Sequence, residues 1–213
     1  PELNMSSNLK ICTHPLVRHK LSALRDKSVA PKEFRELTKE IATLLAYEAM
    51  SDLEMKPRTV AGVDGDTQCE EVSSTIALAP VMRSGLGMVE GFIYAFPDAQ
   101  VWHLGLYRDP KTLVAIEYYN RLTAEAGCDV VYVLDTTLSC GSTARAAVQL
   151  IKDWGVKKIK LVVAVAAPEG LRAFQEEHPD VPVVAGALDP GLNADHEVSP
   201  GIGDAGSRLF GTY

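Results

Sequence analysis

The stretch of chain from Asp129 to Gly155 constrains the fold most strongly, because it predicts a strand, a loop and a helix in succession. The run Asp129-Val-Val-Tyr-Val-Leu134, which is continuously apolar after Asp129, is typical of a parallel strand that is buried on both faces of a sheet. Apolar residues then recur at helical spacing over 144–154, and Gly155 follows as a residue that commonly ends helices. We therefore expect an α/β fold with a parallel sheet.

The loop in this stretch, Asp135 to Thr143, is rich in small hydroxyl residues and begins with an acid at the carboxyl end of the predicted strand. Ligands bind at this edge of open α/β sheets. Free backbone N–H groups and the positive end of the helix dipole favour a phosphate there, while the carboxylate suits sugar hydroxyls or a metal-bound water. The alternative is an ordinary connection in which Ser142 or Thr143 caps the helix.

Composition and charge argue against several classes of protein. The formal net charge of −7 disfavours a general nucleic-acid groove. No apolar run is long enough to cross a membrane, and Pro1 to Lys10 shows no secretory apolar region. The four cysteines form no Cys-x-x-Cys pair, which predicts reduced thiols and a cytoplasmic location. We expect a flexible lead over residues 1–12 and a single domain over 13–213.

Other segments extend this plan. Apolar runs predict further strands, and helical spacing predicts two N-terminal helices, the first capped by Thr13 and the second opened by Pro31. The strands are expected at 76–82, 101–107, 160–167 and 181–188. Residues 58–74 predict a protruding hairpin, and 111–122 suggest a second arm. Arg83 and Arg108 follow two of the strands, where their guanidinium groups could bind an anionic ligand.

Three patterns point only weakly to other chemistries. Gly85 to Gly91 has the spacing G-x-G-x-x-x-G, which gives slight support to a nicotinamide-dependent oxidoreductase. Gly201 to Gly206 has the dinucleotide spacing but follows a proline, so we expect a loop that lines a small planar ligand. Cys140 lacks the flanking glycines of a nucleophile elbow. Two arginines, a phosphate loop and an acid suit a ribose that carries a 5-phosphate and a pyrophosphate.

Many short motifs occur in order along the chain from Thr13 onward. They are His14-Pro-Leu, His19-Lys-Leu, Leu24-Arg-Asp, Phe34-Arg, Ala46-Tyr-Glu, Arg83-Ser-Gly-Leu-Gly-Met, Gly105-Leu-Tyr-Arg-Asp-Pro, Glu117-Tyr-Tyr, Ala166-Ala-Pro-Glu-Gly, His178-Pro-Asp, Gly201-Ile-Gly-Asp-Ala-Gly and Phe210-Gly-Thr. Together they resemble the uracil phosphoribosyltransferases. The resemblance implies a type I phosphoribosyltransferase fold, with a parallel five-stranded core sheet flanked by helices and a protruding β-arm. A hood would be formed by the N-terminal helices and residues 189–213.

The resemblance also implies an activity: uracil and 5-phosphoribosyl 1-pyrophosphate would give UMP and pyrophosphate in pyrimidine salvage. Mg²⁺ would be held mainly through the substrate rather than directly by protein residues. The implied assembly is a homodimer or a homotetramer, and regulation by GTP is left open. Glycosyl transfer builds positive charge on the ribose C1, so a nearby carboxylate and exclusion of water would help.

The resemblance implies particular site residues. Asp204 and Arg108 would act in catalysis, and uracil would be contacted by Val198, Gly203, Asp204 and Ala205. The phosphoribosyl donor would be bound by Arg83, Arg108, Asp135, Thr136, Thr137, Leu138, Ser139, Cys140, Gly141, Ser142, Thr143 and Asp204.

The donor loop departs from the family's usual Asp-Pro-Met-Leu-Ala-Thr-Gly-Gly-Ser, because this chain has Asp-Thr-Thr-Leu-Ser-Cys-Gly-Ser-Thr. Cys140 replaces a hydroxyl residue, and thiols are weak hydrogen-bond donors. Ser142 replaces a glycine, which matters if that position needs a positive φ. Val198 stands where the family has isoleucine, a mild change. The altered loop motivates an alternative function, a catalytically weak or regulatory relative that binds UMP or the donor.

Overall fold

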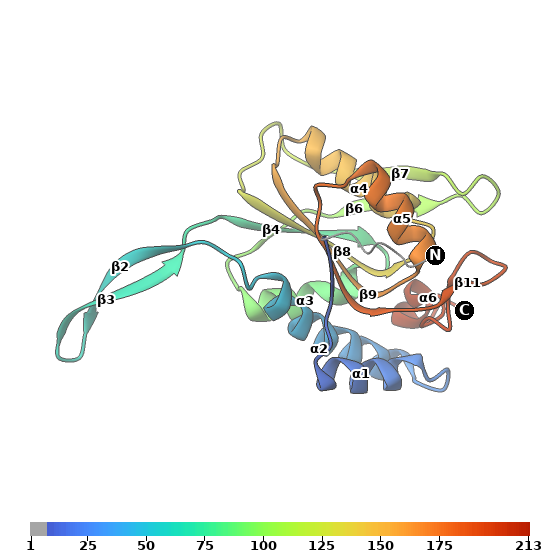
Figure 1. Ribbon diagram of the computed structural model, residues 1–213, viewed down its shortest axis with the longest axis horizontal. Helices are drawn as coiled ribbons and strands as arrows, with labels where there is room; N and C mark the ends of the chain where they lie inside the picture. Colours follow the sequence, from blue (N-terminus) through green and yellow to red (C-terminus); the bar gives the residue numbers. More distant parts are fainter. Residues whose placement is uncertain (1–7) are drawn as a thin grey trace.

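A computed structural model describes residues 8–213, which are organised around an eight-stranded sheet with helices on both faces (Figure 1). In spatial order the main strands are β1 (Leu9–Ile11), β10 (Val183–Leu188), β9 (Lys158–Ala166), β8 (Val130–Leu138), β4 (Ile76–Met82), β6 (Leu104–Arg108) and β7 (Ala115–Asn120). The eighth strand, β5 (Gln100–Val101), also pairs with β4. All pairings are parallel except that of β7 with β6. The predicted α/β fold with a parallel core sheet is therefore confirmed.

The core lies in two layers, because alternate residues of the central strands face opposite sides of the sheet. On β4, Ile76 and Leu78 pack on one side, whereas Ala77 and Ala79 pack on the other. The first side is covered by α1 (Pro15–Arg25), α2 (Pro31–Ala49) and α3 (Leu86–Ala95), and the second by α4 (Ser142–Asp153) and α5 (Pro168–Glu177). Burial on both faces explains why the central strands are almost continuously apolar. Within residues 8–213, no helix is long and apolar enough to span a membrane.

The central strand β8 is longer than its apolar part predicts. Its pairing with β9 continues through Asp135, Thr137 and Leu138, so the strand includes four residues that the sequence places in the loop. Backbone pairing does not depend on side-chain polarity, and threonine is favoured in strands. The prediction that the loop begins at Asp135 is therefore wrong, and the connection to α4 shrinks to residues 139–141.

Three other boundaries also differ from prediction. Residues 9–11 form β1 along β10, so for these residues the predicted flexible lead is wrong, while residues 1–7 lie outside the described part. The strand predicted over 101–107 is divided into β5 and β6. Helix α1 is capped by His14, whose Nδ1 accepts the N–H of Leu16 at 3.2 Å, rather than by Thr13.

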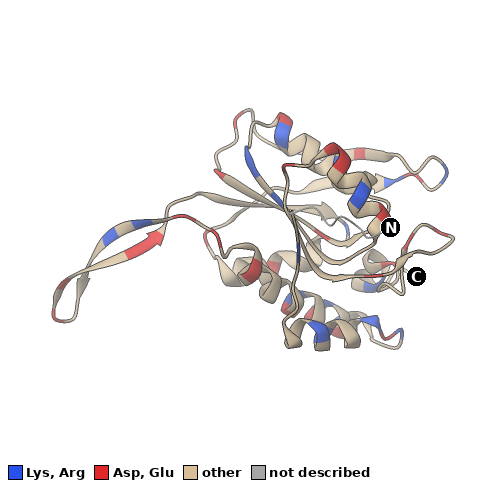
Figure 2. Cartoon of the chain, in the orientation of Figure 1, with Lys and Arg blue, Asp and Glu red and all other residues tan. Residues whose placement is uncertain are grey.

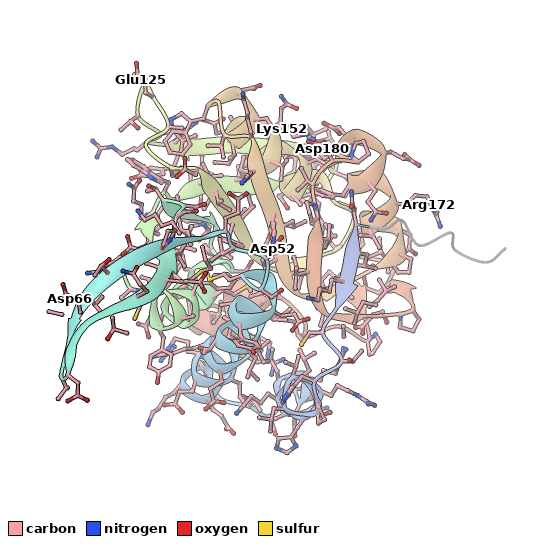
Figure 3. All side chains as sticks on the ribbon, turned by 60° about the vertical axis from the view of Figure 1, so that its left-hand side comes forward. Asp52, Asp66, Glu125, Lys152, Arg172 and Asp180 are labelled. Atoms are coloured by element: carbon pink, nitrogen blue, oxygen red, sulfur yellow. The ribbon has the colours of Figure 1, made fainter. Side chains whose placement is uncertain are left out.

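The predicted protruding hairpin is confirmed as β2 (Met55–Gly62) and β3 (Gly65–Val72), an antiparallel pair that is almost wholly exposed. Asp66 lies at its far end, well away from the sheet (Figure 3). Near the base of this arm, Lys56 and Arg58 on β2 pair with Glu71 on β3 at 3.2 and 2.7 Å (Figure 2). The second predicted arm is the β6–β7 hairpin.

The glycines from Gly85 to Gly91 are explained by close packing between elements. A Cβ atom on Gly85 would lie 2.2 Å from the carbonyl oxygen of Leu134 on β8, and one on Gly91 would lie 2.5 Å from the carbonyl oxygen of Lys39 on α2. Neither distance is tolerated by real Cβ atoms, so both positions need glycine for helix α3 to pack against its neighbours. The spacing that weakly suggested a nicotinamide site therefore has a structural cause.

The C-terminal segment is tied to the N-terminal helices by a buried arginine. This segment contains β11 (Gly191–Leu192), β12 (Val198–Ser199) and the short helix α6 (Ala205–Phe210), where the sequence predicts only a loop. Arg208 is 7% exposed and lies 4.3 Å from the ring centroid of Phe34. Its guanidinium donates to the carbonyl oxygens of Leu24 and Ile202, both at 2.8 Å, and of Asp26.

Arg208→Leu is expected to lower the free energy of unfolding by about 2–4 kcal/mol, because three carbonyl groups lose a charged donor in a buried place. Urea denaturation would measure this loss. Arg35→Leu is the matched control, since Arg35 is exposed and makes one hydrogen bond to the Leu209 carbonyl oxygen at 2.7 Å. The control should lose less than about 1 kcal/mol. Equal losses in the two variants would contradict the structural role of Arg208.

Candidate active site

A cavity of about 450 Å³ opens at the carboxyl ends of β4, β6 and β8, and the C-terminal segment forms one of its walls. This is the edge at which open α/β sheets bind ligands. The charged residues that line it are Arg83, Arg108, Asp135, Glu197 and Asp204. The other lining residues are Val81, Met82, Ser84, Leu106, Tyr107, Tyr118, Thr137, Ser139, Ser142, Thr143, Val198, Ile202, Gly203, Ala205 and Gly206.

The N-terminus of α4 reaches this cavity without a side-chain cap. Its N-cap residue is Gly141, which has a φ of 84° and provides no side-chain cap. Ser142 and Thr143 line the cavity from the first turn. The alternative in which their hydroxyls cap the helix is therefore wrong, and free N–H groups with the positive end of the dipole make this a suitable place for a phosphate.

The tight turn before α4 depends on two glycines. Gly141 takes the positive φ, so Ser142 sits in ordinary helical backbone and its replacement of the family's glycine causes no backbone strain. Gly170, at the start of α5, packs directly against the turn, because a Cβ there would lie 1.9 Å from the carbonyl oxygen of Ser139. Helix α5 thus supports the turn from behind.

Asp135 is a buried carboxylate on β8 that faces the cavity. Burial raises the pKa of Asp135 to about 6, although hydrogen bonds from the Ser84 hydroxyl and from the backbone N–H groups of Thr136 and Thr137 oppose the rise. The Thr136 N–H donates to Oδ1 at 2.8 Å. Because these bonds hold the carboxylate in place, its remaining lone pairs are available to accept hydroxyl groups of a ligand.

Arg108 connects three parts of the site. Its Nη1 donates to the carbonyl oxygen of His196 at 2.8 Å, and it lies 3.5 Å from the Ser139 hydroxyl and 3.7 Å from the Cys140 sulfur. Burial acts to raise the pKa of the Cys140 thiol, but hydrogen bonds from Ser142 and Arg108 outweigh it and lower the pKa. The guanidinium therefore lies between the turn before α4 and the turn before β12.

Arg83 and Asp204 face each other across the other side of the cavity. Asp204 caps α6, since its Oδ1 accepts the Ser207 N–H at 3.1 Å and its Oδ2 accepts the Ser207 hydroxyl at 2.7 Å. Burial acts to raise the pKa of Asp204, but the Ser207 hydrogen bonds and the charge of Arg83 hold it below its ordinary value. Arg83 also donates to the Thr212 hydroxyl at 3.0 Å. Asp204 is thus an ionised carboxylate at neutral pH.

The cavity brings together most of the residues predicted to bind ligands, but four do not line it. Thr136 and Leu138 alternate with the lining residues of β8, so their side chains are buried at 0% and 1% exposure on the other side of the strand. Cys140 and Gly141 lie in the turn behind the lining residues. The ligand roles of the predicted residues stay predictions.

Several lining residues escaped the sequence analysis. Ser84 directly follows Arg83, and Tyr118 lies in the Glu117-Tyr-Tyr motif, so both could have been found from the motifs. Tyr107 lies in the Gly105-Leu-Tyr-Arg-Asp-Pro motif and could have been found in the same way, whereas Glu197 carried no local signal, because it neither follows a strand end nor lies in a glycine-rich loop.

Comparison with known proteins agrees with this geometry. The family model for uracil phosphoribosyltransferase matches residues 11–212. The chain belongs to this family. A uracil phosphoribosyltransferase from Roseiflexus sp. (strain RS-1) is 45% identical over 206 residues, covering 97% of this chain and 99% of that protein. One from Symbiobacterium thermophilum is 46% identical over 207 residues, covering 97% and 99%.

Solved structures agree with the family. The AQ2163 protein from Aquifex aeolicus superposes with a TM-score of 0.92 at 33% identity and covers 96% of this chain and 98% of its own. A hypoxanthine-guanine phosphoribosyltransferase from Bacillus anthracis superposes with a TM-score of 0.50 at 14% identity, covering 75% and 80%, and thus shares the fold. The uracil phosphoribosyltransferase relatives support the predicted transferase, a pentosyltransferase, and give no support to the regulatory alternative.

Asp135→Asn is expected to make the protein more stable at neutral pH. A carboxyl whose pKa rises from 3.8 to about 6 on folding favours the neutral acid in the folded state, so its ionisation removes stability as the pH climbs between these values. Wild type should therefore be less stable than the variant by about 1–3 kcal/mol at about pH 7.5 and equal to it at about pH 4. Chemical denaturation at both pH values tests this, and a difference independent of pH would contradict it.

Proposed function

We propose that the protein transfers the phosphoribosyl group of 5-phosphoribosyl 1-pyrophosphate to uracil, which gives UMP and pyrophosphate. One observation carries the proposal: the uncapped N-terminus of α4 and the buried carboxylate of Asp135 share one cavity. A 5-phosphate fits the free N–H groups of the helix, and the ribose hydroxyls fit the carboxylate. Arg83 and Arg108 supply positive charge for the pyrophosphate.

In the reaction, N1 of uracil bonds to the ribose C1 while the bond from C1 to the pyrophosphate oxygen breaks. The electron pair of that bond leaves with the pyrophosphate, and N1 gives up its proton. Positive charge develops on the ribose as the bond breaks, and the ionised carboxylate of Asp204 stabilises it in a cavity walled by the C-terminal segment. Exclusion of water by this wall also prevents hydrolysis of the donor.

Uracil is read largely by the backbone of the C-terminal segment in this proposal. Val198, Gly203 and Ala205 line the cavity together, and the φ of 69° at Gly203 turns the chain there. Backbone groups that pair with the carbonyl and N–H edge of uracil would leave an amino group of cytosine unpaired in a buried place, which costs binding energy.

Mg²⁺ fits the site as an ion shared with the donor. The cavity offers carboxylate oxygens from Asp135 and Asp204, which are hard ligands of the kind that Mg²⁺ prefers. Within residues 8–213, no group of three or more His, Cys, Asp or Glu side chains could hold a metal ion, so donor phosphates and waters would provide the remaining ligands. When bound, the ion neutralises charge on the leaving pyrophosphate.

The proposal extends to the oligomeric state and the cellular location of the enzyme. The exposed β2–β3 and β6–β7 arms are suitable contacts for a homodimer or homotetramer. Free thiols at Cys12, Cys69, Cys128 and Cys140 suit the reducing cytoplasm.

The direct test is uracil-dependent release of pyrophosphate from the donor in the presence of Mg²⁺. We expect turnover with uracil and at least about 100-fold less with cytosine, because an unpaired buried polar group costs about 1–3 kcal/mol or more. Binding of UMP without any turnover would contradict the proposal and would favour a regulatory protein.

Arg108→Ala is expected to lower kcat/KM for the donor by about 10- to 100-fold, the loss typical of a hydrogen bond to a charged group. Thermal unfolding should change little, because Arg108 packs at a strand end rather than in the core. Arg18→Ala, on the exposed face of α1, removes the same charge far from the cavity and should leave both quantities unchanged. A large drop in Tm with unchanged donor kinetics would show that Arg108 is structural.

A further inference from the structure

Glu197 is a carboxylate in the cavity that no part of the proposed function uses. Its side chain is half-buried and lines the cavity, and the residue directly precedes Val198 in the segment proposed to read uracil. Glu197 therefore belongs to the segment that is proposed to read uracil, whereas the phosphate is proposed to bind at the N-terminus of α4.

Neither oxygen of the Glu197 carboxylate accepts a hydrogen bond, whereas each of the other two carboxylates in the cavity accepts at least two. Asp135 accepts the Ser84 hydroxyl and the Thr136 N–H, and both oxygens of Asp204 are occupied by Ser207. Among residues 8–213, no hydrogen bond or ion pair reaches the Glu197 carboxylate, and only the backbone N–H and carbonyl of this residue are engaged, both with Asn193. Such a half-buried carboxylate that lines a ligand cavity can accept a proton donor from the ligand.

The position of Glu197 is fixed from both sides. Its N–H donates to Asn193 Oδ1 at 2.9 Å, and the strands β11 and β12 pair through Leu192 and Val198. Arg108 holds the preceding residue by its hydrogen bond to the His196 carbonyl oxygen at 2.8 Å. The arginine that is proposed to face the donor therefore also holds the turn that presents Glu197.

We infer that Glu197 accepts the N1 proton of the pyrimidine during transfer, an inference that rests on the proposed function. As N1 bonds to the ribose C1 and the pyrophosphate leaves with its electron pair, the N1–H bond breaks and the proton moves to an oxygen of Glu197. The resulting carboxylic acid returns the proton to water after UMP leaves. Asp204 suits this task less well, because its oxygens already accept two hydrogen bonds and face the cation Arg83.

Glu197→Gln tests this role, because glutamine keeps the shape of the side chain and cannot take the proton. Single-turnover rates with uracil should fall by about 100-fold, a loss typical of a missing general base. Rates with 5-fluorouracil should fall by only about 10-fold, because its ring N–H groups are more acidic and the transfer of a more acidic proton depends less on a general base. Donor affinity should stay within about twofold of wild type, because Glu197 contacts the base and not the phosphates.

Asp195→Asn is the matched control: it neutralises an exposed carboxylate two residues away, on the same turn, that does not line the cavity. It should leave both rates unchanged. Unchanged rates in Glu197→Gln, or equal losses with the two bases, would overturn the assignment while leaving the transferase function intact. A wild-type protein without uracil turnover would overturn the proposed function and this assignment together.

Discussion

The parallel pairing of β8 with β9 continues beyond the apolar part of β8, and the site depends on this continuation. It carries Asp135 into a buried position and places Leu138 opposite Ala166 before the chain turns. The turn is then short enough for Gly141 alone to take the positive φ and for α4 to begin at Ser142. A strand that ended at Leu134 would leave a long flexible loop, and the N-terminus of α4 would have no fixed relation to the carboxylate.

The wall opposite this turn is tied to the N-terminal helices by polar contacts. Two nitrogens of the Arg25 guanidinium donate to the two carboxylate oxygens of Asp189, at 2.7 and 2.6 Å. Arg25 also donates to the Gly201 carbonyl oxygen, and Asp189 accepts the Gly201 N–H. Charged hydrogen bonds with this geometry fix orientation as well as contributing energy. The N-terminal helices thereby position the residues that are proposed to surround the base, although these segments lie at opposite ends of the chain.

How far the sequence predicts this protein depends on whether local or distant interactions decide each feature. The strands over 76–82 and 160–167 were predictable because residues buried on both faces leave a continuous apolar run. The extent of β8 was not, because pairing with β9 overrides the polar composition of residues 135–138. The six-residue helix α6 was missed because the buried Arg208 in it donates to the carbonyl oxygens of Leu24 and Asp26, which lie at the end of α1 and far away in the sequence.

The residues of the site also divide into those that local sequence predicts and those that depend on distant interactions. Arg83 follows β4, Arg108 ends β6 and Asp135 follows the apolar part of β8, so their convergence could be foreseen from the rule that parallel strands end at one edge. That Thr136 and Leu138 point away from the cavity could not be predicted, because side chains alternate in this way only if the strand continues beyond Leu134. Glu197 enters the cavity only because the segment before β12 folds back over the sheet, which no local pattern records.

A crystal structure with UMP bound tests most directly whether one cavity holds a phosphate at α4 beside a sugar at Asp135. We expect the 5′-phosphate within hydrogen-bond distance of the first N–H groups of α4 and the ribose hydroxyls on the Asp135 carboxylate. A phosphate bound elsewhere, or an Asp135 carboxylate that contacts no ribose hydroxyl, would contradict it.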